Sequence, residues 1–120
     1  MATRYKKGDR DSRPWGCWEV LDTADEYCIK KIKVNAGGVL SLQLHNYRDE
    51  HWIMVKGEGL VTLGEEKLNK KANEVVYIPA QTKHRIENPT NSDLEFIEIQ
   101  TGDNLDEDDI IRLEDKYGRI

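Results

Sequence analysis

The chain has 120 residues, a net charge of −5 and a hydrophobic content of 38%, which suits one soluble domain with a modest core. The negative balance disfavours nucleic acids and anionic membranes as partners, because both would repel it. No apolar run approaches the roughly 20 residues that a membrane span needs, and residues 1–13 lack the apolar stretch of a signal peptide. We therefore expect a cytoplasmic protein in which Cys17 and Cys28 stay reduced.

Residues 1–13 are rich in Arg, Lys and Asp and predict a mobile N-terminal arm ahead of a single domain over residues 14–120. From Trp15 to Thr101, short β-like runs alternate with turn residues such as Asn, Gly and Pro. Strands at this spacing, with no helical period between them, are typical of a β-sandwich or barrel. The expected strands cover residues 17–21, 27–34, 39–44, 51–56, 59–63, 74–78, 84–88 and 94–100.

The tail differs from the rest of the chain, and residues 105–118 predict one short C-terminal helix. The acidic run at residues 106–109 would lie at the helix start, where the helix dipole favours negative charge. Ile110, Ile111 and Leu113 would supply a narrow apolar stripe. We interpret the acidic run as a solvated helix start rather than as a ligand site.

Four side chains form the candidate metal site. Gln43 and His45 are two residues apart in an expected strand, so they point to one face while the neighbouring leucines point to the other. Glu50 follows after a short turn, and His84 comes much later in the chain. A lone histidine is more often structural than a ligand. Together, however, one amide oxygen, two imidazoles and one carboxylate suit one divalent ion, such as zinc, manganese, iron, cobalt or nickel.

The spacing of these residues resembles that of the cupins. The run Gly37-x5-Gln43-x-His45-x4-Glu50-x6-Gly57 resembles the first cupin motif, with Gln in place of its first His. Asn73, Pro79, His84 and Asn88 resemble the second motif, in which Asn73 and Gln81 replace two usual glycines. The resemblance implies an all-β fold, a cupin jelly-roll β-barrel, here with the short C-terminal helix added.

A closer resemblance extends over about residues 13–119. Over this range the sequence resembles the C-terminal isomerase domain of bifunctional mannose-1-phosphate guanylyltransferase/mannose-6-phosphate isomerase. Segments that carry it include Arg13-Pro14-Trp15-Gly16, Arg48-Asp49-Glu50-His51-Trp52, His84-Arg85-Ile86-Glu87-Asn88-Pro89 and Ile97-Glu98-Ile99-Gln100-Thr101-Gly102. Asn46 and Tyr47 depart from it, because related sequences usually carry further histidines there. Nothing resembles the Gly-rich phosphate loop of the transferase half, so no guanylyltransfer is expected.

This resemblance implies a metal-dependent interconversion of mannose 6-phosphate and fructose 6-phosphate, in GDP-mannose and polysaccharide biosynthesis. A small-molecule sugar phosphate would be the partner, and a homodimer is expected. For the phosphate, Lys30, Arg48 and Arg85 are candidates, with Arg48 favoured because a guanidinium holds phosphate in a bidentate fork. His51 is the candidate for proton transfer, because its reference pKa is close to working pH.

Two alternatives stay open at this point. The chain could be a cupin that binds a sugar or sugar nucleotide in a polysaccharide pathway without turnover, since a fold does not fix function. It could also be an isomerase or epimerase that acts on an uncharged or acidic sugar. The substitutions at Asn46 and Tyr47 keep the first alternative open.

Overall fold

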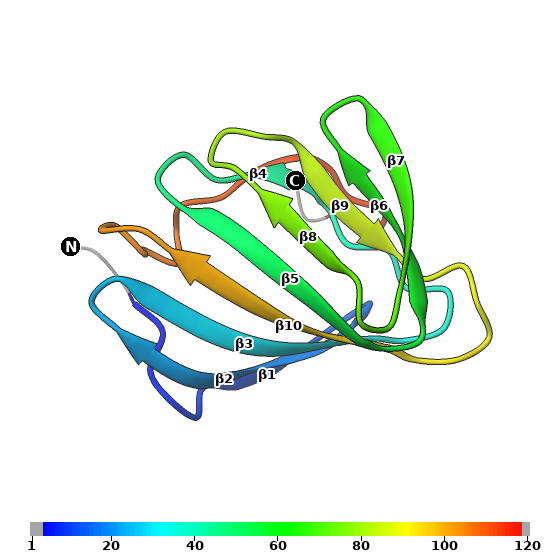
Figure 1. The fold of residues 1–120 in the computed structure, drawn as a ribbon, viewed down its shortest axis with the longest axis horizontal. Helices are drawn as coiled ribbons and strands as arrows, with labels where there is room; N and C mark the ends of the chain where they lie inside the picture. Colours follow the sequence, from blue (N-terminus) through cyan, green and yellow to red (C-terminus); the bar gives the residue numbers. More distant parts are fainter. Residues whose placement is uncertain (1–3, 119–120) are drawn as a thin grey trace.

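Two antiparallel β-sheets make up the fold in a computed structural model that describes residues 4–118 (Figure 1). One sheet has six strands in the order β1-β2-β3-β10-β5-β8, and the other has five in the order β11-β4-β9-β6-β7. The strands are β1 (Arg10–Arg13), β2 (Gly16–Ala24), β3 (Tyr27–Val34), β4 (Leu42–Leu44), β5 (Asp49–Lys56), β6 (Glu58–Leu63), β7 (Glu66–Lys71), β8 (Val75–Ile78), β9 (His84–Glu87), β10 (Leu94–Thr101) and β11 (Ile111–Glu114).

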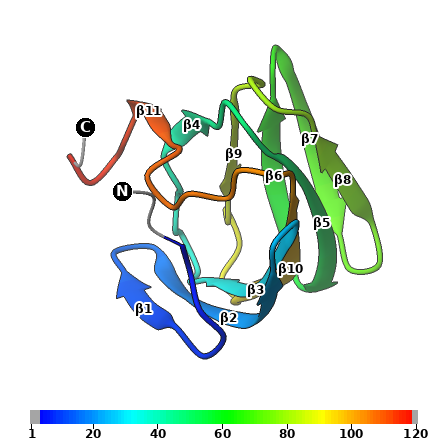
Figure 2. The ribbon, with the colours of Figure 1, turned by 90° about the vertical axis from the view of Figure 1, so that its left-hand side faces the viewer.

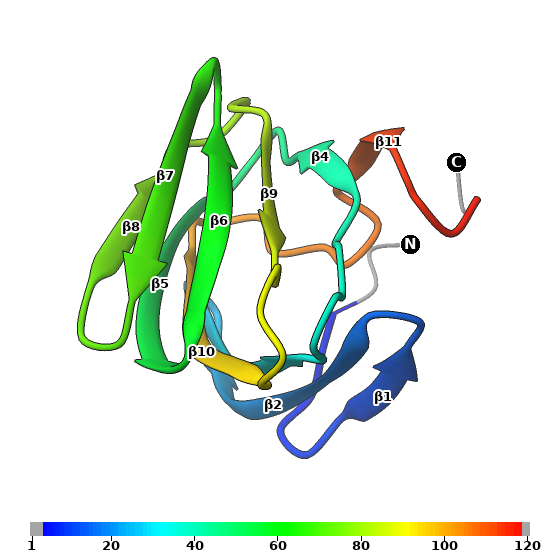
Figure 3. The same ribbon diagram turned by 90° about the vertical axis from the view of Figure 1, so that its right-hand side faces the viewer.

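The sheets face each other across a shared interior, as the two side views show (Figures 2 and 3). Strict alternation in the long strands produces this arrangement, because every second side chain points inward. In β10, for example, Leu94 and Phe96 are fully buried while Glu95 and Ile97 are only partly covered. The apolar core formed in this way consists of Trp15, Ile32, Val34, Leu40, Trp52, Met54, Val61, Val76, Ile78, Ile86, Leu94 and Phe96.

The cupin jelly roll predicted from the sequence is therefore present, but its strands do not form one closed barrel: the pairing divides into two sheets. Tight turns carry the chain from one sheet to the other. Gly57, between β5 and β6, adopts φ 80°, and a Cβ there would lie 2.7 Å from the backbone oxygen of Asp93. Only glycine fits both the positive φ and this close approach, so the chain can turn sharply out of β5.

The predicted C-terminal helix is wrong. Residues 105–118 contain turns and strand β11, and no helix occurs among residues 4–118, so none of them could cross a membrane as a helix. The register pairs Ile111 with Leu44 and Arg112 with Gln43. Two adjacent isoleucines favour strand over helix, and β4 offers an edge that β11 covers (Figure 2).

Part of the predicted N-terminal arm is folded. Residues Arg10–Arg13 form β1 and pair with β2 of the same chain. Farther upstream, Tyr5 packs edge-on against Trp18 with the ring centroids 5.1 Å apart. Residues 1–3 of the arm lie outside the described residues, and the division of the chain at residue 13 stays a prediction.

Candidate metal centre

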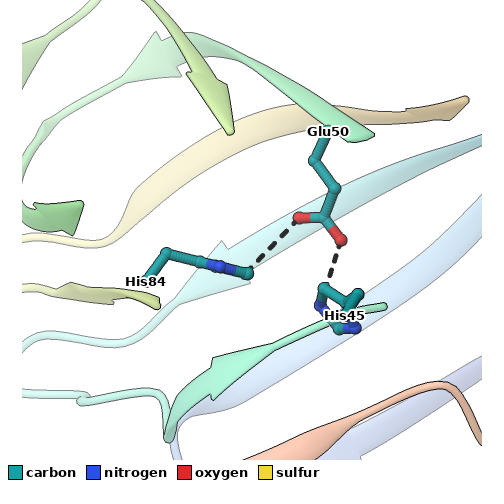
Figure 4. Close-up of side chains that lie close together, drawn as sticks. All are labelled: His45, Glu50 and His84. Carbon is teal, nitrogen blue, oxygen red and sulfur yellow. Dashed lines mark ion pairs between the residues drawn. The ribbon is translucent and has the colours of Figure 1, made fainter. Parts of the chain in front are cut away.

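Three potential metal ligands meet in a buried cavity between the two sheets. His45 directly follows β4, Glu50 lies in β5 and His84 begins β9. One ligand atom of each lies within 4.8 Å of the others, and all three side chains are buried. His45 Nε2 is 3.2 Å from one carboxylate oxygen of Glu50, and His84 Nε2 is 3.8 Å from the other (Figure 4).

Backbone carbonyls fix the orientation of both imidazoles. The Nδ1 of His45 lies 2.6 Å from the carbonyl oxygen of Asp109, and the Nδ1 of His84 lies 2.9 Å from that of Thr82. A carbonyl can only accept, so each Nδ1 carries the proton and each Nε2 is directed at Glu50. Metal-binding histidines are commonly held by such a bond from the other ring nitrogen.

The charges in the centre also suit a metal ion. Burial, with the cation of Arg48 adding to it, lowers the pKa of His45 to about 3, so its Nε2 keeps a free lone pair at neutral pH. Burial would raise the pKa of Glu50, but Arg48 and His84 outweigh it and lower that pKa to about 2. A neutral imidazole and an ionised carboxylate are the ligand states that divalent transition metals take. The donor set is therefore compatible with such an ion.

Gln43, the fourth predicted ligand, lines the same cavity. It lies in β4 directly opposite His84 in β9, so the two side chains share a face. Its Nε2 donates to the hydroxyl of Ser41 at 3.1 Å, which leaves the amide oxygen for another partner. Coordination by Gln43 stays a prediction.

Arg48 contacts two of the three ligands. Its Nη2 lies 2.8 Å from the Glu50 carboxylate and 3.2 Å from His45 Nε2, and its Nε donates to Glu50 at 2.9 Å. The buried guanidinium lies between the Glu50 carboxylate and His45 Nε2. Without it, the lone pairs of these two groups would face each other. An ion bound to His45 Nε2 would take over this contact.

Lys30 and Arg85, the other two predicted cations, also line the cavity. Lys30 is buried, with its Nζ 3.6 Å from the ring centroid of Tyr5 and 4.6 Å from that of Trp18. These cation–π contacts stabilise the ammonium inside the fold.

The structure does not bring His51 to the cavity. In β5 the side chains alternate, so His51 lies on the opposite face from Glu50 and Trp52. Its ring packs against that of Tyr77 on the outer face of the sheet, with centroids 4.7 Å apart. The predicted proton-transfer role thus lacks any contact with the other site residues.

Sequence analysis missed Glu98, a buried carboxylate that lines the cavity. It accepts hydrogen bonds from Trp52 Nε1 at 3.2 Å and from Gln100 Nε2 at 2.9 Å. Burial and the neighbouring Glu50 charge raise the pKa of Glu98. The sequence could have indicated this position, because side chains alternate along a strand and Glu98 and Gln100 therefore point to the same face as Leu94 and Phe96.

Asp109, which belongs to the predicted solvated helix start, is a second site residue that the sequence pattern does not indicate. Its side chain accepts hydrogen bonds from the backbone N–H groups of Asn46 and Tyr47, at 2.8 and 3.0 Å. Together with its carbonyl bond to His45, Asp109 ties the loop after β4 to the C-terminal segment. Tyr47, one of the two positions that depart from related sequences, is exposed.

A jelly roll of two sheets with a buried His–Glu–His cluster defines a cupin with a candidate metal centre. The cupin domain of Schizosaccharomyces pombe Cnp3 superposes with a TM-score of 0.70 at 14% identity, covering 74% of this chain and 66% of that one. At this identity the likeness shows the fold alone.

The family is narrower than the fold. Residues 3–115 match the family described as Mannose-6-phosphate isomerase C-terminal, and the chain belongs to it. The xanthan biosynthesis protein XanB of Xanthomonas campestris pv. campestris is 49% identical over 107 residues, which cover 89% of this chain and 23% of XanB. The mannose-1-phosphate guanylyltransferase ManC of Salmonella typhimurium is 43% identical over 108 residues, 90% of this chain and 22% of ManC. The chain thus spans less than a quarter of the length of these relatives.

Proposed function

We propose that this chain is a metal-dependent isomerase that interconverts mannose 6-phosphate and fructose 6-phosphate. The observation that carries the proposal is the buried cluster of His45, Glu50 and His84, whose ligand atoms lie within 4.8 Å of one another and whose two imidazoles are oriented by backbone carbonyls. Membership of the family supports the choice of reaction.

The reaction transfers a proton from C2 of the aldose to C1 of the ketose through a cis-enediol, while the proton on O2 moves to O1. A bound divalent ion would act as a Lewis acid toward the two sugar oxygens, held by His45, Glu50 and His84 with Gln43 as a fourth ligand. Arg48 is close enough to this position to stabilise negative charge that develops on the enediol oxygens. The cavity offers the Glu98 carboxylate for proton transfer, whereas His51 lies on the outer face.

A coupled assay for fructose 6-phosphate tests the proposal. The chain is stripped with a chelator and reloaded in turn with Zn²⁺, Mn²⁺, Co²⁺, Ni²⁺ or Fe²⁺. At least one metal should restore turnover, and His45→Ala and His84→Ala should abolish it. His51→Ala is the matched histidine control and should keep turnover near wild type. A chain that binds one metal ion yet turns over no substrate with any of these metals would overturn the proposal.

A further inference from the structure

Strand β11 brings Arg112 to the mouth of the metal cavity. The register places Arg112 opposite Gln43, and Gln43 opposite His84, across three neighbouring strands. Residues directly opposite each other in antiparallel strands share a face. Arg112 is therefore the outer member of a row that ends at a proposed metal ligand, and it lines the same cavity.

The guanidinium of Arg112 has no partner among residues 4–118. Its Nε is buried and makes no hydrogen bond, and the side chain takes part in no ion pair. A buried donor without a partner is unfavourable, and native structures rarely keep one without a reason. Arg112 therefore lines the cavity with a positive charge that no ion pair among residues 4–118 offsets.

The other guanidinium groups that line the cavity are already engaged. Arg48 bonds to Glu50, Arg85 pairs with Glu114 at 3.0 Å, and Arg13 pairs with Asp11. Arg85 also donates to the Leu40 carbonyl. Of the cavity-lining arginines in the described part of the chain, Arg112 is the one whose charge is left for a ligand.

The position of Arg112 suits the far end of an elongated ligand. Arg112 lines both the inner cavity and a groove that continues outward from it, as do Arg13 and Ile110. The metal cluster lies deeper, between the sheets. A ligand whose reacting carbons lie at the cluster would therefore extend its other end toward Arg112. The outer groove also carries the carboxylates of Asp9, Asp11, Glu107 and Asp108. Of these four only Glu107 also lines the inner cavity, so an anion would bind on the inner side of Arg112.

We infer that Arg112 binds the phosphate group of the substrate and so selects phosphorylated sugars. The inference rests on the proposed function and adds the anion-binding residue of the same site. A guanidinium can hold a phosphomonoester through two parallel, charge-assisted hydrogen bonds. This assignment replaces Arg48, whose donors are directed at Glu50 and His45.

The test measures binding without turnover. The probe is mannitol 1-phosphate, the reduced form of the substrate, which cannot isomerise, and its Kd is measured by calorimetry on the metal-loaded chain. Arg112→Gln should weaken binding at least about tenfold, because a charge-assisted contact is lost. Arg112→Lys should recover part of the affinity, since it keeps the charge but not the fork. Arg10→Gln, which removes an exposed guanidinium of the outer groove, is the charge-matched control and should bind as wild type.

Metal affinity and Tm are measured on the same preparations. The inference predicts that both stay at wild-type values in Arg112→Gln while phosphate binding falls. Wild-type affinity for the probe in Arg112→Gln would overturn the inference, as would a parallel loss of metal binding and Tm in Arg112→Lys. If wild type binds the probe through Arg112 but shows no isomerase turnover, the proposed reaction is wrong and the phosphate site is still supported. Isomerase turnover in wild type, together with wild-type affinity of Arg112→Gln for the probe, would overturn the phosphate site and leave the proposed reaction in place.

Discussion

At the scale of single residues, Arg48 and the metal ion are alternatives for the same contact. The Arg48 guanidinium contacts Glu50 and His45 Nε2, and an ion held by these two residues would lie against the same atoms. Glu50 has 1% of its side chain exposed, so its negative charge must be offset inside the protein. The guanidinium of Arg48 provides that offset through its ion pair and hydrogen bond with Glu50.

Replacing Arg48 should therefore separate stability from metal binding. Arg48→Ala should destabilise the metal-free chain by about 3–5 kcal/mol, the usual effect of removing one partner of a buried pair. A divalent ion would then supply the missing charge, so adding metal should raise Tm more in Arg48→Ala than in wild type. Thermal denaturation with and without metal measures both effects. Arg13→Ala, which removes a largely exposed pair with Asp11, is the control and should change stability much less than Arg48→Ala. Equal metal-induced shifts in wild type and Arg48→Ala would contradict this account.

The alternation of side chains between the two faces of a strand explains why some site residues could be predicted from the sequence and others could not. The Gln43–His45 alternation and the later His84 indicated a shared pocket, and the structure brings His45, Glu50 and His84 together. The reference pKa of His51 suggested a proton-transfer role. Because His51 is adjacent to Glu50 in the same strand, however, it points to the opposite, outer face. Asp109 could not be predicted, because its role depends on which strand the tail pairs with.

At the scale of the elements, β11 shows the limit of local sequence patterns. Residues 105–118 carry an acidic start and an apolar stripe that suit a helix, but tertiary pairing with the β4 edge overrides this preference. Strand β7, with the sequence Glu-Lys-Leu-Asn-Lys-Lys, was also missed because it is almost wholly polar. It forms because it pairs along its whole length with β6. The alternating strands such as β3 and β10 were predicted nearly to their ends.

Asp109 should affect metal binding through its hydrogen bonds with His45, Asn46 and Tyr47, although it is not itself a proposed ligand. Asp109→Ala leaves the N–H groups of Asn46 and Tyr47 without their acceptor. The loop that carries His45 is then less firmly fixed, and so is the orientation of the imidazole. Metal affinity should fall about 10- to 100-fold, as for other groups that orient a ligand. Calorimetric titration with metal measures this loss. Asp108→Ala removes an exposed carboxylate one residue away and should bind metal as wild type. An Asp109→Ala chain with wild-type affinity would show that the carbonyl alone fixes His45.

At the scale of the whole molecule, the outer face of the six-stranded sheet is apolar near its β8 edge. Ile53, Val55, Val75 and Tyr77 are exposed on it by 39–53% of their surface, and the register places Ile53 opposite Val75 and His51 opposite Tyr77. Contiguous exposed apolar side chains commonly mark an interface. The homodimer expected from the sequence stays a prediction, and this face now gives it a location. The N-terminal arm is a weaker candidate, because residues 10–13 pair within their own chain.

Light scattering tests the dimer. Wild type should have a mass of twice 13.9 kDa, and a charge on this apolar face, as in Val75→Lys, should shift it toward the monomer. Asn69→Lys, on β7 of the other sheet, is the control and should keep the dimer. A wild-type mass of 13.9 kDa at all working concentrations would remove the expectation.

The proposed function places the isomerisation of mannose 6-phosphate at an ion that His45, Glu50 and His84 would hold. The most direct measurement adds the best activating metal in small steps to the stripped wild-type chain and records the initial rate of fructose 6-phosphate formation at each step. The account predicts no rate without metal, a linear rise, and a break at one equivalent per chain. Full activity in the stripped chain, or a rate that does not follow the bound metal, would contradict it.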